Sequence, residues 1–338
     1  MIDWLFVSAT GMNIPIDFRL FLAPFIILFV GCLIWFSPHI QTTKPQLNLH
    51  AENSTQPPDI SRQREYLRFR NVLLNWPPDK PKAAIYYLAK ADRLDKLNRS
   101  LTSLYHCFLH TFDYPVIVFH ETVSRDVLHG TFRKQHANIR LFLQEVEFNT
   151  PAHLNASLAR VNVGCKRFPI GYRHMCRFHA KQIYEQEILV GLEYVWRLDD
   201  DSLLLKNINY DLFAFMNNHR LQYGYITVNS DSPECVKYLW EAAKLHKNLR
   251  SLKSEFFDKW RAPNMFYNNF EISALSLWTS QQYQDYINYI DLLGGIYYHR
   301  WGDAPIKSIA VTLFLRKEET HLFNVSYEHQ GFRTRPRP

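Results

Sequence analysis

Three consecutive aspartates, Asp199, Asp200 and Asp201, follow a short apolar segment at residues 193–198. Its aromatic and β-branched residues predict a strand. Adjacent carboxylates repel one another, and a divalent cation such as Mg²⁺ or Mn²⁺ relieves that repulsion by taking oxygen ligands. Because side chains alternate along a strand, we expect Asp199 and Asp201 to face one site and Asp200 to point away. The triplet indicates a site for a metal-bound diphosphate, although a solvated acidic turn would have the same sequence.

The apolar pattern around the triplet alternates between strands and helices. Short apolar runs predict strands at residues 83–89, 115–121, 139–146, 193–198 and 223–228, and helical patterns are found at residues 92–112, 172–190 and 232–246. This alternation is typical of an α/β fold whose mostly parallel sheet is covered by helices on both faces. Ligands of such folds bind outside the carboxyl ends of the strands, where the triplet lies. A nucleotide-sugar glycosyltransferase needs this arrangement, because a metal must neutralise the departing diphosphate.

An uncharged apolar run at residues 20–36 predicts a single membrane anchor. A cleaved signal peptide would have a basic segment before the run and small residues after it, and the chain has neither. A core helix would not be followed by a long segment rich in Pro, Gln, Asn and Thr. We therefore expect a short cytoplasmic tail at residues 1–19, the transmembrane anchor at 20–36, a lumenal stem at 37–81 with one helix near 61–74, a catalytic domain at 82–332 and a basic tail at 333–338.

The composition excludes several classes of protein. Of the 338 residues, 47% are hydrophobic and 21% are charged, which is enough apolar side chain for a sizeable core. Only 11 residues are Gly, and the chain has no glycine-rich motif of the kind that cradles nucleotide phosphates. The net charge is +7, but Arg333, Arg335 and Arg337 supply three of these charges and no run of Lys and Arg is present. We therefore expect no nucleic-acid partner.

Sequons and cysteines are consistent with a lumenal domain. Sequons for N-glycosylation lie at Asn53, Asn98, Asn155 and Asn324. In an oxidising compartment the cysteines beyond the anchor could form two disulfides with three possible connectivities, or they could remain free thiols. These are Cys107, Cys165, Cys176 and Cys235.

Several segments carry a resemblance to a known family. They are YRHMCRF at residues 172–178, VWRLDDD at 195–201, NNFEIS at 268–273, GGIYYHRWGDAPIKSIA at 294–310 and YEHQGF at 327–332. In this order they resemble the fungal Golgi α-1,2-mannosyltransferases, glycosyltransferase family fifteen, over residues 82–332. The resemblance implies a GT-A nucleotide-diphospho-sugar transferase domain on a type II membrane anchor, with its catalytic domain in the Golgi lumen. It also implies Mn²⁺-dependent transfer of mannose from GDP-mannose to the 2-hydroxyl of a mannose-containing glycan, with retention, in protein glycosylation or mannan synthesis.

The resemblance implies roles for residues that would hold the donor. Asp199, Asp201 and His329 match the metal-binding positions, and either aspartate could be the direct ligand. Both aspartates would also contact the nucleotide. Lys90, which follows the first predicted strand, could contact guanine or phosphate or could be a solvated lysine. Arg177 is the remaining candidate for a donor contact.

Tyr172 and Glu271 match the positions closest to the reacting sugar carbon. Glu271 lies in an apolar stretch, where an unpaired carboxylate would be costly to bury. It could be a nucleophile beneath the anomeric carbon, or it could bind an acceptor hydroxyl. The acceptor region would include His299, Arg300, Trp301 and Asp303.

The chain also departs from the family pattern. Asp200 replaces a proline, Lys307 replaces a common histidine, and His299 replaces a common glutamate. These departures leave two alternatives open, a membrane-tethered relative that binds mannosides without turnover and a transferase that uses another nucleotide sugar.

Overall fold

The computed structural model describes residues 60–334, apart from residues 156, 158–164 and 166–167. The expected membrane anchor at residues 20–36 and most of the expected stem lie outside this range. Among the helices that are described, each is too short or too polar to cross a bilayer. The described residues all belong to one compact unit, Pro58–Pro338.

A seven-stranded sheet forms the centre of this unit, in the order β10-β6-β9-β4-β1-β2-β3. Neighbouring strands are parallel except where β9 pairs with β4 and β6. The sequence prediction of a mostly parallel sheet is therefore confirmed. The strands are β1 (Ala83–Ala89), β2 (Val116–His120), β3 (Leu141–Glu145), β4 (Tyr194–Leu198), β6 (Tyr223–Tyr225), β9 (Phe270–Ala274) and β10 (Thr320–Leu322).

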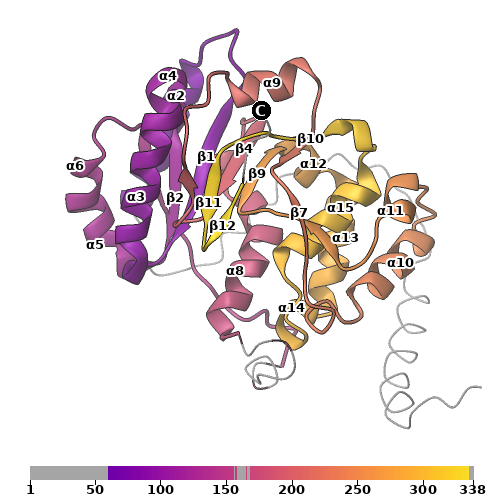
Figure 1. Ribbon diagram of the computed structural model, residues 1–338. Coiled ribbons are helices and arrows are strands. Elements are labelled where there is room, and N and C mark those ends of the chain that lie inside the picture. The colour runs from indigo at the N-terminus through magenta and orange to yellow at the C-terminus, as the bar shows by residue number, and fades with distance from the viewer. Residues whose placement is uncertain (1–59, 156, 158–164, 166–167, 335–338) are drawn as a thin grey trace, which may run out of the picture. The chain divides into compact units, whose positions relative to one another are not determined.

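Helices cover both faces of the sheet because successive strand residues point to opposite faces. On β1, Ile85 and Tyr87 pack in a core with α3 (Leu94–Leu104) and α9 (Leu212–Asn218). Tyr86 packs on the other face, in a core with α2 (Ile60–Leu74) and α8 (Ile170–Ala180). The unit is therefore a three-layer α/β/α structure (Figure 1).

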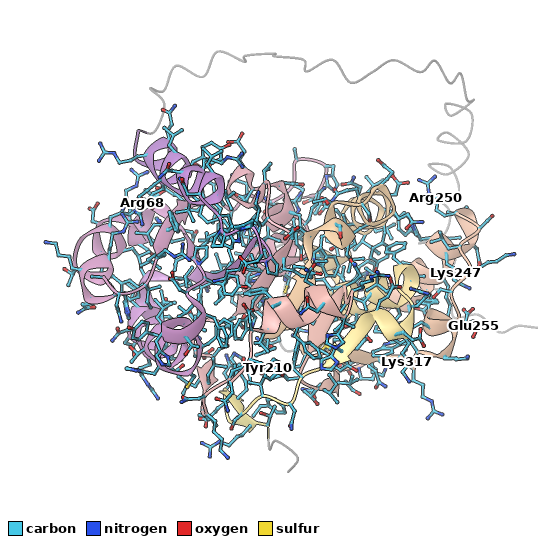
Figure 2. The ribbon with its side chains drawn as sticks, turned by 90° about the horizontal axis from the view of Figure 1, so that it is seen from above. Arg68, Tyr210, Lys247, Arg250, Glu255 and Lys317 are labelled. Carbon is cyan, nitrogen blue, oxygen red and sulfur yellow. A yellow bond between two sulfur atoms is a disulfide. The ribbon has the colours of Figure 1, made fainter. Side chains whose placement is uncertain are left out.

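A third core lies among the C-terminal helices, at the right in Figure 1. Figure 2 shows Lys247 and Arg250 at this end of the unit and Arg68 of α2 at the opposite end. The helices are α10 (Leu239–Leu249), α11 (Glu255–Lys259), α12 (Leu275–Thr279), α13 (Gln281–Leu292), α14 (Gly295–Tyr298) and α15 (Asp303–Phe314). Two small sheets complete the fold, β5 (Leu203–Leu204) with β11 (Tyr327–His329) and β12 (Phe332–Arg333), and β7 (Val228–Ser230) with β8 (Asn264–Phe266).

Several predicted helices differ in extent from those observed. The helix predicted at residues 92–112 is confirmed as a nearly continuous run that begins at Ala91–Arg93 and continues through α3 to α4 (His110–Phe112). The helix predicted at 172–190 ends at Ala180 and is followed by the 3₁₀ turns Gln182–Glu185 and Glu187–Leu189. The helix predicted to start near residue 232 starts at Leu239 instead. The remaining short helical segments are Tyr105–Leu109, Thr122–Ser124, α5 (Arg125–Val127), Leu128–Phe132, α6 (Arg133–Gln135) and Lys317–Glu319.

The boundary predicted between stem and catalytic domain, residue 81, is wrong. Helix α2 lies within the predicted stem, but it packs against the edge strand β3. Its Glu65 is 3% exposed, accepts hydrogen bonds from Arg133 and from the Leu143 backbone N–H (3.2 Å), and pairs with Arg68. Arg68 donates to the Leu141 carbonyl at 2.6 Å. The helix therefore satisfies backbone groups of an edge strand, and the folded domain begins by residue 60.

Cysteine pairing lies between the two alternatives from the sequence, two disulfides or four free thiols. Cys165 and Cys235 form a disulfide, whereas Cys107 and Cys176 are free thiols. Three of the four sequon asparagines, Asn98, Asn155 and Asn324, are exposed, and Asn53 lies outside the described residues.

Candidate active site

A cavity of about 780 Å³ opens at the carboxyl ends of β1 and β4. This is the edge of the sheet at which α/β folds bind ligands. The ends of these strands, helix α8 and the start of α15 form its wall. Seven of the residues singled out in the sequence line it, namely Lys90, Tyr172, Asp199, Asp200, Arg300, Asp303 and His329.

The aspartate triplet forms a turn rather than a continuation of β4. The Ser202 hydroxyl accepts a hydrogen bond from the Asp199 N–H, and the Ser202 N–H donates to the Asp199 carbonyl, both at 3.0 Å. Strand alternation does not hold in a turn, so the predicted orientation of the three side chains is wrong in part. Asp199 and Asp200 line the cavity, whereas Asp201 is not part of its lining.

Asp200 is held by Arg93, which sequence reasoning missed. The Arg93 Nε atom lies 2.9 and 2.7 Å from the two Asp200 carboxylate oxygens, and its Nη2 atom reaches Asp201 at 2.7 Å. The pKa of Asp200 is raised, because burial and the adjacent charges of Asp199 and Asp201 together outweigh the effect of Arg93. One guanidinium therefore neutralises two of the three adjacent carboxylates.

Pairing between β5 and β11 brings His329 to the triplet. Leu203 pairs with Glu328 in this antiparallel ladder. His329, the next residue on β11, therefore lies beside the end of the aspartate turn that precedes β5. The Nε2 atom of His329 is 2.9 Å from Asp201 Oδ1 and 3.6 Å from Asp199 Oδ2. Two residues 128 positions apart, Asp201 and His329, thus meet at the end of β4, as the resemblance implied.

These side chains fit the donor set of a divalent metal site. His329 Nδ1 lies 2.6 Å from the Tyr267 hydroxyl, an outer contact that fixes the orientation of the imidazole. His329 Nε2 and Asp201 Oδ1 are buried and have no well-aligned hydrogen-bond partner among the described residues. In the part of the chain that the structure describes, no group of three His, Cys, Asp or Glu side chains is already arranged to hold a metal ion. The donor types are those that Mn²⁺ accepts, but the carboxylates are engaged in ion pairs.

Arg197, a buried residue of β4, links the triplet to α15. Its guanidinium lies 3.1 Å from Asp199 and forms a second ion pair with Asp303, the first residue of α15. Asp303 also accepts a hydrogen bond from Asn268 at 2.7 Å. Burial alone would raise the pKa of Asp303, but the charge and hydrogen bond of Arg197, with the hydrogen bond from Asn268, outweigh this and lower it. The cavity therefore has an ionised carboxylate in its floor.

Tyr172 and Arg300 form an aromatic and cationic wall. The Tyr172 ring stacks on Phe168 with centroids 4.3 Å apart, and the Arg300 guanidinium lies 4.4 Å from the Phe168 centroid. Arg300 donates to the Tyr172 hydroxyl and to Asp231, both at 2.8 Å. Planar rings with a nearby polar rim are suited to the faces and hydroxyl edges of a sugar.

A family profile described as glycolipid 2-alpha-mannosyltransferase matches residues 39–338. The chain belongs to this family. The probable mannosyltransferase MNT3 of Candida albicans is 35% identical over 207 residues, which are 57% of this chain and 55% of that protein. The probable mannosyltransferase KTR3 of Saccharomyces cerevisiae is 30% identical over 286 residues, which are 76% of this chain and 69% of that protein. The chain thus spans little more than half the length of the first of these relatives.

Two solved structures of mannosyltransferases share the fold. Core-mannan synthase A of Aspergillus fumigatus in its Mn/GDP form has a TM-score of 0.70 and 25% identity, over 75% of this chain and 76% of that chain. A mannosyltransferase of S. cerevisiae in complex with GDP has a TM-score of 0.70 and 22% identity, over 83% and 84% of the two chains. The mixed α/β architecture expected for the family is therefore confirmed.

Glu271 does not lie where the resemblance to family fifteen placed it. It is 1% exposed and is not part of the cavity wall. Its carboxylate forms an ion pair with Lys307 and accepts hydrogen bonds from Tyr223 at 3.1 Å and Ser273 at 3.2 Å. The expectation that Glu271 faces the sugar is wrong in this structure, because Lys307 holds the carboxylate in the core.

Arg177 is likewise outside the cavity wall. It forms a two-pronged pair with Asp291, at 2.7 and 2.8 Å, and Lys181 joins the same carboxylate at 2.8 Å. The structure therefore does not place Arg177 on the cavity, its donor contact stays a prediction, and these cations attach α8 to α13.

His299 and Trp301 flank Arg300 but do not reach the cavity. Arg300 has a φ of 65°, a left-handed conformation that turns the chain at this point. The Trp301 ring packs over Gly295, where a Cβ atom would lie 2.2 Å from it, and its indole donates to the Lys237 carbonyl at 2.8 Å. Both predicted acceptor-site residues therefore shape the loop that presents Arg300.

Proposed function

We propose that this chain transfers mannose from GDP-mannose to the 2-hydroxyl of an acceptor mannoside, with retention, as an α-1,2-mannosyltransferase of the GT-A type. The observation that carries the proposal is the meeting of Asp199, Asp201 and His329 at the end of β4, beside a cavity of about 780 Å³. Membership of the family supports the same activity. The Mn/GDP form of the related Aspergillus enzyme supports the same donor nucleotide.

We propose Mn²⁺ as the cofactor, held by Asp201 and His329 with Asp199 as a further oxygen ligand. When bound, this metal neutralises the diphosphate that departs with the nucleoside. Arg93 and Arg197 pair with Asp200 and Asp199 and hold these carboxylates in place. Lys90, at the end of β1 on the same cavity wall, is placed to contact the phosphates or the base.

The rest of the wall would bind the two sugars. Asp303 and Asn268 in the floor offer an acceptor and a donor of hydrogen bonds to hydroxyl groups. Tyr172 and Phe168 offer stacked rings to a sugar face, and Arg300 fixes the Tyr172 hydroxyl. Glu271 is outside the wall, so we propose that it supports the fold and does not form a covalent adduct.

The test is a donor–acceptor panel with the purified lumenal domain, residues 58–338. Incubation with GDP-mannose, Mn²⁺ and methyl-α-mannoside should give a disaccharide whose linkage and anomeric configuration are read by NMR. Asp201→Asn is the matched control, because it removes one charge and keeps the shape. Acceptor binding without product would support the binding-only alternative, and product from a UDP-sugar alone would support a different donor.

We further propose that the apolar run at residues 20–36 anchors the protein as a single-pass type II Golgi membrane protein. Exposed sequons at Asn98, Asn155 and Asn324 support a lumenal domain. Protease protection in intact microsomes, together with a glycosidase-sensitive mass shift, tests this placement. Cleavage of the domain without detergent would contradict it.

A further inference from the structure

His179 is a buried polar residue that neither the ion pairs nor the metal site uses. It lies on α8, two helical turns after Tyr172, and so shares that face of the helix. Its side chain is 2% exposed and lines the cavity. Its Nδ1 atom has no hydrogen-bond partner among the described residues. A buried imidazole nitrogen without a partner is costly, so a missing partner is expected.

The surroundings indicate that this partner is uncharged. Burial is the main cause that lowers the pKa of His179, and Arg197 lowers it further, so the ring is neutral at physiological pH. A neutral imidazole has one donor and one acceptor nitrogen, which suits a hydroxyl group. The carboxylate of Asp303 near it would repel a phosphate, and the metal-binding side chains lie at the triplet instead.

We propose that His179 binds a hydroxyl group of the hexose that is transferred, and so helps to determine which sugar the enzyme accepts. The inference rests on the proposed function and extends it to a residue of the donor-sugar subsite. Asp303 and Asn268 line the same cavity, so the hydroxyls of one hexose would meet three polar groups. The hydrogen-bond partner that His179 Nδ1 lacks is then a hydroxyl group of the substrate.

A bridging water is the competing explanation. The Tyr86 hydroxyl is also buried without a partner, and the Tyr86 and His179 rings are 6.0 Å apart. A water held between them would satisfy both groups and make His179 structural. Tyr86 does not line the cavity, so Tyr86→Phe is a control that disturbs such a water and leaves the cavity wall intact.

The experiment compares three substitutions of His179. Leu removes both nitrogens, Asn places an amide where Nδ1 lies, and Gln places one where Nε2 lies. We expect His179→Leu to lower kcat/KM for GDP-mannose about 10- to 100-fold, with an unchanged melting temperature. One of the two amide variants should recover most of this loss. Calorimetry should show that all variants bind GDP, which has no hexose, within about twofold of wild type.

GDP-deoxymannose donors then identify the hydroxyl. Wild type should discriminate against one deoxy donor, and His179→Leu should lose that discrimination, as a direct contact requires. The proposal is overturned if His179→Leu keeps its kcat/KM, if it loses GDP affinity equally, or if Tyr86→Phe has the same effect. If wild type transfers no mannose at all, the proposed function fails. Even then, a loss of affinity for GDP-mannose but not for GDP in His179→Leu would show that His179 binds the hexose.

Discussion

Removing one partner of the Glu271–Lys307 pair should damage the fold more than removing both. The two side chains are fully buried, and Tyr223 and Ser273 add hydrogen bonds to the carboxylate. Lys307→Met leaves a buried carboxylate without its cation, which typically costs about 3–5 kcal/mol. For a domain of this size that loss lowers the melting temperature by roughly 10 °C.

The double variant Glu271→Gln/Lys307→Met replaces the pair with neutral groups of similar volume. Gln can keep the contacts to Tyr223 and Ser273, so we expect the double variant to recover most of the loss. Replacement of a buried pair by well-packed neutral groups is often close to neutral in stability. Thermal and urea unfolding of the four proteins in the cycle measure the coupling between the two residues.

Glu271→Gln alone should make stability depend on pH. Burial already lowers the pKa of Lys307, and Glu271 is the main group that raises it. Without Glu271 the folded state releases the Lys307 proton at neutral pH, whereas the unfolded chain keeps it up to a pKa of about 10.4. The unfolded state then binds more protons, so stability rises with pH by up to about 1.4 kcal/mol per unit relative to wild type. The double variant has no lysine to titrate and should show no such slope.

Activity of the double variant decides the chemistry of Glu271. Because the carboxylate lies outside the cavity wall, kcat should stay within about tenfold of wild type once the fold is restored. A nucleophile would instead lose several orders of magnitude, since its removal abolishes the covalent route. A stable double variant with such a loss, or a mannosyl adduct on Glu271 found by mass spectrometry, would refute this assignment.

Three other substitutions test separate parts of the structure. Asp201→Asn should abolish Mn²⁺-stimulated turnover with little change in melting temperature, and activity that still responds to Mn²⁺ would exclude Asp201 as a ligand. Glu65→Gln should cost about 2–4 kcal/mol in urea unfolding because it leaves buried arginine contacts unpaired, whereas Leu67→Ala on the exposed side of α2 should cost almost nothing. Arg177→Met should weaken the attachment of α8 to Asp291 and lower the melting temperature. The KM for GDP-mannose should stay unchanged, and a tenfold rise would restore Arg177 as a donor contact.

The sequence predicted what depends on local pattern. The nearly continuous burial of β1 follows directly from its apolar residues, and the position of the triplet follows from the end of β4. His329 could not be found by pattern, because a single histidine near a terminus has no periodicity. Only the resemblance pointed to it, and the pairing of β5 with β11 explains why it lies beside Asp201.

Long-range partners explain why two predicted site residues lie outside the cavity wall. Arg177 and Asp291 are 114 residues apart, and nothing near either residue indicates their pairing. Glu271 was expected at the sugar because the resemblance placed it there and a buried carboxylate suggested a function, but its cation is on another element. Arg197 is a signal for such partners in the sequence, since an arginine inside an apolar strand must pair with buried anions.

Two successive ion pairs, Arg197–Asp303 and Glu271–Lys307, join the central sheet to helix α15. Arg197 and Glu271 lie directly opposite each other on β4 and β9, so their side chains share one face of the sheet. Asp303 and Lys307 are one turn apart on α15 and pair with them in the same order. The Glu271–Lys307 pair therefore holds α15 against the sheet one helical turn beyond Asp303, which lines the cavity. Arg197 connects Asp303 to Asp199. A cation at position 307 thus helps to position the carboxylates at the end of β4 from outside the cavity wall.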